Sequence, residues 1–164
     1  MSQIYRKDSF DRFGDDLCQH LLSFLSLEDR FPFECLSKHW RRFIFKTNSR
    51  LIISRKLCNK LKIKFNDYTA FELMLKKLPN ITAIECTNVS IDNNMFELII
   101  KYCCHLNTIN VKLDENITVH TIDMFFIKYD KQLNAIEFKI QMFTDSEELQ
   151  KGKVAENMKL CEKV

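Results

Sequence analysis

The sequence contains few of the residues that build tight turns. Its 164 residues include only two glycines and two prolines. Two-residue β-hairpin turns usually need glycine or asparagine in left-handed backbone conformations, so this composition disfavours an all-β sandwich. The two glycines, Gly14 and Gly152, are also too few to form a glycine-rich phosphate-binding loop.

Long apolar runs and a recognisable secretory signal are missing as well. No stretch approaches the ~18 apolar residues that a membrane span needs, and the first ten residues, MSQIYRKDSF, are polar and charged. The seven cysteines are odd in number and irregularly spaced, which favours reduced thiols over a disulfide framework. We therefore expect an intracellular protein, cytoplasmic or nuclear, with no membrane contact.

Residues able to carry chemistry do not form a recognisable constellation. Cys103-Cys104-His105 fits no zinc-ligand spacing and is interpreted as packing thiols and a histidine at a helix end. The other histidines lack a nearby serine or cysteine motif partner, and paired carboxylates such as Asp15-Asp16 are interpreted as helix-start or loop charges. We assign no catalytic, cofactor-binding or metal-binding residue and predict that the chain is not an enzyme.

The charge is distributed unevenly along the chain. Residues 1–65 carry 14 Lys and Arg against 7 Asp and Glu, whereas residues 66–164 carry 11 against 15. This shift indicates two units that meet near residue 65. The basic half could contact nucleic acid, but such charges more often form a solvated helix face, so nucleic-acid binding is the less favoured interpretation.

Residues 13–45 carry the apolar spacing of short helices. Leu17, Leu21, Leu22 and Leu25 recur at i, i+4, i+5 and i+8, which predicts one apolar helix face. A second stripe follows, centred on the only tryptophan, Trp40. Three short helices are predicted, with more large apolar side chains than a unit of this size can shield alone, so a partner is expected.

This segment, FGDDLCQHLLSFLSLEDRFPFECLSKHWRRF, resembles the F-box. The family pattern is Leu-Pro-x-Glu-Leu, an Ile/Leu-Phe-x-x-Leu cluster, Leu-x-x-x-Asp-Leu and Val-Cys-(Lys/Arg)-x-Trp, and the run aligns with it without a gap. Gly14 replaces the usual proline, which is expected to loosen the first turn, and Ser37 replaces the cysteine. The matching positions are Phe13, Asp16, Leu17, Leu21, Leu22, Leu25, Asp29 and 36–40.

The resemblance implies that another chain completes the apolar surface. In F-box proteins this is the Skp adaptor of cullin–RING ubiquitin ligases. An alternative is that Leu22, Phe33 and Trp40 pack inside the unit or against the residues that follow. The residues that the resemblance assigns to adaptor binding are Phe13, Leu17, Leu21, Leu22, Leu25, Leu36 and Trp40.

A repeat occupies the second half of the chain. The segments ITAIEC (81–86), LNTINV (106–111) and LNAIEF (133–138) share one spacing at offsets of 25 and 27 residues. Helix-like stretches precede them at 70–78, 94–103 and 121–130, and LKIKF (61–65) is a weaker candidate for an earlier strand. One strand and one helix per 25–27 residues is typical of leucine-rich repeats, as found after F-boxes, although a non-repeating α/β domain is the alternative.

Stacked repeats predict which side chains are buried. One strand–helix unit cannot bury its own apolar face, so neighbouring units must share a core. The residues expected in that core are Ile81, Ile84, Leu106, Ile109, Leu133 and Ile136. The polar positions between them are expected to form a concave face that binds a target, with Glu85, Asn110, Lys112, Glu137 and Lys139.

The sequence therefore predicts an α/β fold: an N-terminal three-helix F-box module followed by a short leucine-rich-repeat solenoid of strands and helices. The expected division is an F-box module at 9–48, a linker or irregular first repeat at 49–69, repeats at 70–143, and a charged tail or poor cap at 144–164. The implied function is that of a substrate receptor in an SCF-type ubiquitin ligase. Two alternatives remain open: an interaction scaffold with a vestigial F-box, which Gly14 and Ser37 favour, and a basic nucleic-acid-binding module.

Overall fold

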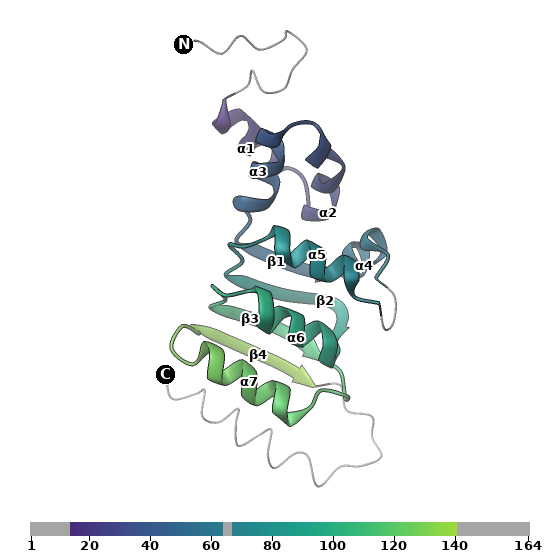
Figure 1. Cartoon of the computed structure of the whole chain (residues 1–164), viewed down its shortest axis with the longest axis vertical. Coiled ribbons are helices and arrows are strands. Elements are labelled where there is room, and N and C mark those ends of the chain that lie inside the picture. The colour runs from purple at the N-terminus through teal and green to yellow at the C-terminus, as the bar shows by residue number, and fades with distance from the viewer. Residues whose placement is uncertain (1–13, 64–66, 141–164) are drawn as a thin grey trace.

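The chain folds as a mixed α/β protein with a four-stranded parallel sheet, as a computed structural model shows (Figure 1). The structure describes residues 14–63 and 67–140. Its strands follow the order β1-β2-β3-β4, so neighbours in sequence are neighbours in the sheet. The elements are α1 (Asp15–Ser23), α2 (Leu27–Arg30), the 3-10 helix η2 (Phe31–Cys35), α3 (Lys38–Lys46), β1 (Arg50–Ser54), α4 (Arg55–Leu61), α5 (Thr69–Lys77), β2 (Ala83–Ile91), α6 (Asn93–Tyr102), β3 (Thr108–Leu113), α7 (Val119–Tyr129) and β4 (Ala135–Ile140).

A unit of short helices, residues 14–46, forms one end of the molecule and is called the helical module below (Figure 1). Two acidic residues in the first turn of α1 suit the positive end of the helix dipole. Helix α3 begins at Ser37, whose hydroxyl accepts a hydrogen bond from the Trp40 backbone N–H at 3.1 Å. The interior of the module is apolar and contains Cys18, Leu22, Trp40, Phe43 and Ile44.

The sheet is held in register by one row of buried aliphatic side chains. Leu51 of β1 lies beside Ile84 of β2, Ile84 beside Ile109 of β3, and Ile109 beside Ile136 of β4. Leu51, Ile84 and Ile109 are fully or almost fully buried. Because side chains alternate along a strand, the neighbouring residues in each strand point to the opposite face of the sheet.

The same backbone hydrogen bonds recur where each strand begins. The Ser49 carbonyl accepts from Thr82 and Ala83 N–H, the Thr82 carbonyl from Asn107 and Thr108, and the Asn107 carbonyl from Asn134 and Ala135. The accepting residues are separated by 33 and 25 residues. This repetition means that successive units start in the same backbone geometry.

Each helix that directly follows a strand is capped by a polar side chain. Ser54 accepts from Leu57 N–H at the start of α4, Asp92 from Met95 N–H at the start of α6, and Thr118 from Thr121 N–H at the start of α7. These bonds satisfy N–H groups that lack a partner within the helix. The caps fix the points where the chain turns from sheet to helix.

Helices α5, α6 and α7 cover one face of the sheet and leave the other open (Figure 1). Each helix contributes a fully buried phenylalanine: Phe71, Phe96 and Phe125. The rings of Phe96 and Phe125 stack at 5.2 Å between centroids. Aromatic packing between adjacent helices therefore continues the core from one strand–helix unit to the next.

A bulge interrupts the pairing of β2 with β3. The register shifts between Glu85 and Ser90, and Asn88 adopts a positive φ of 57°. Asparagine tolerates this left-handed conformation better than most side chains do. The bulge leaves the residues between Glu85 and Ser90 without register partners in β3.

The predicted helices and strands of the second half are confirmed within two or three residues at most boundaries, and so is the α/β class. Four of the six predicted core residues are fully or almost fully buried, whereas Leu133 and Ile136 beside the last strand are half-buried. The strand suggested at 61–65 is not found at 61–63, where Leu61 ends helix α4, and residues 64 and 65 lie outside the described residues; the first strand is Arg50–Ser54. That strand and α4 lie inside the segment expected to be a linker or irregular first repeat.

Two further expectations concern other parts of the chain. The tail at 144–164 falls outside the described residues. Within the described ranges, no helix combines the length and the apolar character that crossing a bilayer requires.

The register generates a stability prediction. Replacing Ile109 with alanine should destabilise the fold by roughly 2–5 kcal/mol, because the side chain is 1% exposed in the middle of the buried row. Asn110→Ala is the matched control and should cost much less, since Asn110 lies on the open face. Urea unfolding of both variants checks this. Equal losses would contradict the assignment of faces.

Candidate functional site

The helical module presents an apolar face to solvent. Leu17 and Leu21 of α1 are 41% and 39% exposed, and Phe24, which follows the helix, is 74% exposed. At 3.6 residues per turn these positions fall within an arc of about 60°. Phe33 and Leu36, near η2, are also exposed. These five residues are called the exposed apolar set below.

The leucines of α1 therefore lie on two faces of the helix, one exposed and one buried, rather than on one. Leu22 is 3% exposed and packs in the module with Cys18, while Leu25 is half-buried. The single apolar face predicted for Leu17, Leu21, Leu22 and Leu25 is thus wrong: the side chains at i and i+4 point outward and the one at i+5 points inward. Sequence analysis missed Phe24, although its i+7 spacing from Leu17 was the available signal.

Trp40 also lies inside the module. The indole is 5% exposed, and its ring centroid lies 6.4 Å from that of Phe33. Of the three residues weighed as interior, Leu22 and Trp40 are buried, whereas Phe33 is partly exposed at 37%. Trp40 therefore lies beside Phe33 of the exposed apolar set. Phe13 falls outside the described residues.

The two departures from the F-box pattern have local explanations. Ser37 caps helix α3, a role for which its hydroxyl is suited. Gly14 precedes α1 with φ of −63°, a value that proline also adopts, and no atom lies within 4 Å of the Cβ position that another residue would occupy there. The backbone here is therefore compatible with the proline of the family pattern, and the expected loosening by glycine stays a prediction.

Ion pairs connect the helical module to the first helices after it. The Lys56 ammonium of α4 lies 2.6 Å from a carboxylate oxygen of Asp29 in α2, and Lys77 of α5 lies 2.7 Å from Glu34 in η2. The hydrogen bond from Lys56 holds the pKa of Asp29 below its usual value. Exposed pairs of this kind contribute little energy each, so these contacts mark where the units meet rather than what stabilises them.

The open face of the sheet carries one row of side chains across all four strands. Ile52, Glu85, Asn110 and Glu137 are partners in register. Lys112 and Lys139 form the next level of the same face and are also partners. The structure thus brings together all five predicted target-binding residues on one surface.

Hydrogen bonds organise this surface. Arg50 Nη2 lies 2.6 Å from Glu85 Oε2, and the Asn110 amide donates to the Glu137 carboxylate. Lys139 Nζ lies 3.0 Å from Glu137 Oε1. The face therefore offers alternating charges and amide groups in fixed positions, which suits recognition of a polar partner.

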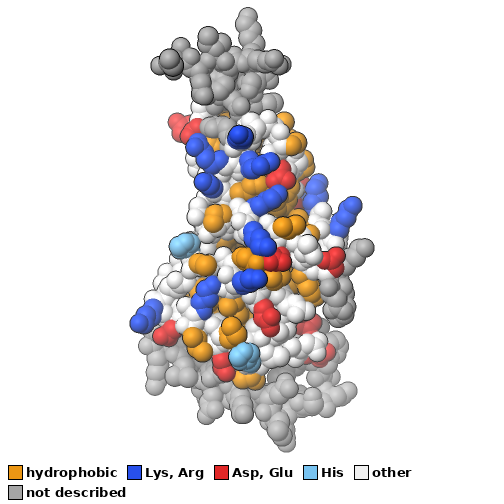
Figure 2. All heavy atoms as spheres, in the orientation of Figure 1, with side chains coloured by type: hydrophobic (Ala, Val, Ile, Leu, Met, Phe, Trp, Pro, Cys, Tyr) orange, Lys and Arg blue, Asp and Glu red, His pale blue; other side chains and the backbone are white. Residues whose placement is uncertain are grey.

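The basic residues of the N-terminal half do not form one free positive surface. Lysines and arginines spread over the helical module and the neighbouring helices, with acidic side chains among them (Figure 2). A nucleic-acid interface would need seven basic side chains on one face: Lys38, Arg41, Arg42, Lys46, Arg50, Arg55 and Lys56. Three of them are paired with carboxylates of this chain: Arg42 with Asp15, Arg50 with Glu85 and Lys56 with Asp29. This pairing disfavours a nucleic-acid interface.

The Cys103-Cys104-His105 cluster lies at the end of α6. Cys103 is buried, whereas Cys104 and His105 are exposed. Burial raises the pKa of Cys103 to about 12, so its thiolate is scarce near neutral pH. The described residues contain no group of three or more His, Cys, Asp or Glu side chains that could hold a metal ion.

No protein-family model matches this sequence, and no curated protein matches it.

Burial of the thiols generates a labelling prediction. In the native protein at pH 8, iodoacetamide should modify Cys35 and Cys104, which are exposed, and should leave Cys86 and Cys103 unmodified. Burial raises the pKa of both protected thiols to about 12, so the reactive thiolate forms only well above pH 8. Peptide mass spectrometry before and after urea addition measures this. Rapid native labelling of Cys103 would contradict the packing of α6.

Proposed function

We propose that the chain is a substrate receptor of an SCF-type cullin–RING ubiquitin ligase. The helical module docks on the Skp adaptor, and the open face of the sheet holds a protein target. The chain itself performs no chemistry: it raises the effective concentration of target beside the enzymes that other subunits carry. The proposed setting is intracellular, cytoplasmic or nuclear.

The exposed apolar set is the observation that carries this proposal. Its five large side chains remain at the surface although the module has a filled core of its own. An apolar surface of this kind on a small helical unit favours a protein partner. The succession of helices, from Asp15 to Lys46, agrees with the resemblance to the F-box.

The second half of the chain supports the receptor role. Parallel strands in sequence order, helices on one face and recurring hydrogen bonds at the strand starts are the features expected of stacked repeats. We propose that these units form a short leucine-rich-repeat solenoid. Its open face supplies the polar row of Glu85, Asn110 and Glu137 for target recognition.

An interaction scaffold without a ligase role is the second candidate. The burial of Leu22 and Trp40 favours it, because two of the seven assigned adaptor contacts are largely withdrawn into the module. Both candidates use the same open face for a partner. Adaptor binding distinguishes them, since a scaffold with a vestigial F-box does not bind Skp.

The adaptor prediction uses a double substitution, Leu21→Asp with Leu36→Asp. Wild-type chain should co-purify with the Skp adaptor, and the double variant should lose at least about a hundredfold in affinity, because two unpaired carboxylates would be buried at the contact. Both leucines are at least 39% exposed, so the fold should survive. Calorimetry with purified adaptor measures the affinity.

The matched control is Met124→Asp with Ile127→Asp on α7, where both side chains are exposed outside the helical module. It should bind the adaptor as wild type does. Adaptor at a hundredfold excess over Kd should also stabilise the wild-type chain by about 2.7 kcal/mol in thermal unfolding. An unchanged melting temperature under saturating adaptor, or equal binding by both double variants, would reject the ligase role.

The target prediction uses Glu85→Lys with Glu137→Lys. Reversing two charges in the row should weaken binding of proteins that dock on the open face, since mismatched charge lowers affinity and slows encounter. Asp123→Lys with Asp130→Lys makes the same charge change at exposed sites on and beside α7 and should have little effect. Quantitative mass spectrometry of co-purifying proteins compares them. Identical profiles for both variants would reject the open face as the binding surface.

A further inference from the structure

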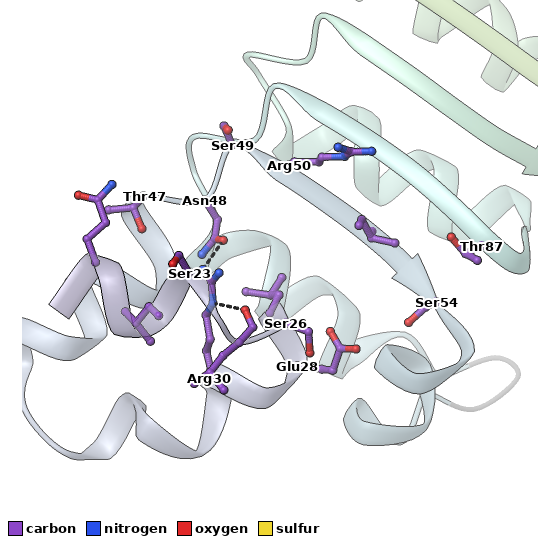
Figure 3. A pocket seen from close by; sticks show the side chains of 15 residues that line it. Ser23, Ser26, Glu28, Arg30, Thr47, Asn48, Ser49, Arg50, Ser54 and Thr87 are labelled. Atoms are coloured by element: carbon purple, nitrogen blue, oxygen red, sulfur yellow. Dashed lines mark hydrogen bonds between the residues drawn. The ribbon is translucent and has the colours of Figure 1, made fainter. Parts of the chain in front are cut away.

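A cavity of ≈ 580 Å³ separates the helical module from the first strand (Figure 3). One wall is formed by α1, α2 and the loop between them, and the other by residues 47–50 with Ile52, Ser54 and Thr87. From α1 it is lined by Gln19, Leu22 and Ser23, whereas no residue of the exposed apolar set lines it. The cavity is therefore separate from that set. It opens beside the row of Ile52, Glu85, Asn110 and Glu137.

Arg30 is the central charged group of this cavity (Figure 3). Its Nε donates to the Leu25 carbonyl at 2.9 Å, and its Nη1 donates to Asn48 Oδ1 at 2.8 Å. Both acceptors are neutral, and within the described part of the chain no carboxylate pairs with this guanidinium. Burial lowers the pKa of Arg30, which reflects the cost of desolvating its charge.

The remaining charges around the cavity are already paired. Glu28, largely buried, lies 3.6 Å from Lys56, and Arg50 lies 2.6 Å from Glu85. Arg30 is therefore left as a half-buried cation whose counter-ion this part of the chain does not supply. Buried charges are normally paired, so the cavity is electrostatically suited to an anion from outside.

Further groups favour an anion carried on a peptide. The Ser54 hydroxyl accepts from Leu57 N–H, which leaves its hydrogen available for donation, and the Thr87 hydroxyl also lines the cavity. Ile52 is 45% exposed on the same wall and offers an apolar contact beside the donors. A free inorganic ion or a nucleic-acid backbone would leave that contact unused.

We propose that this cavity binds a negatively charged side chain of a target peptide: an oxyanion, either the phosphate of phosphoserine or phosphothreonine or the carboxylate of Asp or Glu. Arg30 receives the oxyanion through its uncommitted Nη2. Arg50 at the rim, whose Nη2 is bonded to Glu85, contributes through its other N–H groups. The inference rests on the proposed function only in taking the peptide to be part of a target. Planar guanidinium groups bind both kinds of oxyanion in a fork geometry.

The test measures fluorescence anisotropy of labelled 11-residue peptide libraries with the full chain in about 0.15 M salt, where exposed charges are largely screened. Three libraries share randomised flanks and differ only in a central phosphoserine, aspartate or serine. The phosphoserine library, the aspartate library or both should bind about 10- to 100-fold more tightly than the serine library. The library whose affinity exceeds that of the serine library shows whether the oxyanion is a phosphate or a carboxylate.

Arg30→Gln should remove this gain. Arg50→Gln is a second variant that cannot unfold the module, since Arg50 is 60% exposed, and it should reduce the gain several-fold. Arg41→Gln is the matched control: it makes the same change at an exposed α3 position outside the cavity and should leave the gain intact.

Three results would overturn the proposal. They are equal binding of all libraries, equal behaviour of all three variants, and tighter binding of a single-stranded RNA oligonucleotide than of either anionic library. The assay contains no adaptor, so failure here leaves adaptor docking untouched. Loss of adaptor docking likewise leaves the peptide result standing.

Discussion

The apolar row of Leu51, Ile84 and Ile109, which are buried, and Ile136, which is half-buried, is the constraint on which the rest of the structure depends. These side chains can leave water only if helices cover that face, so α5, α6 and α7 must all lie on the same side of the sheet. Alternation along each strand then forces the residues between them onto the other face. The polar row is thus a consequence of core packing, and its register follows from the register of the core.

The helical module depends on the same packing. Helix α3 leads into β1 through residues 47–49. The position of the first strand therefore constrains the position of the C-terminal end of α3. In this connection, the Thr47 side chain donates a hydrogen bond to the Phe43 carbonyl, and the Asn48 side chain donates one to the Ile44 carbonyl at the end of α3. Lys56 of α4 and Lys77 of α5 also form ion pairs with Asp29 and Glu34 of the module. Leu17 and Leu21 of α1 remain exposed.

Much of this arrangement could be predicted from the sequence where one period repeats. Three segments with the spacing of ITAIEC predicted β2, β3 and β4, and the intervening helical periodicity predicted the helices that cover them. The division of the α1 leucines between two faces could not be predicted, because neighbouring positions such as Leu21 and Leu22 are both apolar and only the packing of α3 decides which is covered. The cavity, which joins residues from 19 to 87, depends on tertiary structure alone.

The first strand escaped prediction for a reason that also bears on function. In register, Asn48 occupies the position that Ile81, Leu106 and Leu133 hold before the later strands. A polar residue there broke the sequence pattern, and in the structure its amide oxygen accepts the hydrogen bond from Arg30. The first strand–helix unit thus lacks the apolar core residue of the later units. In its place Asn48 lines the cavity and accepts a hydrogen bond from the half-buried Arg30. Local departures from a folding rule tend to fall at functional sites, and the cavity lies at the irregular unit.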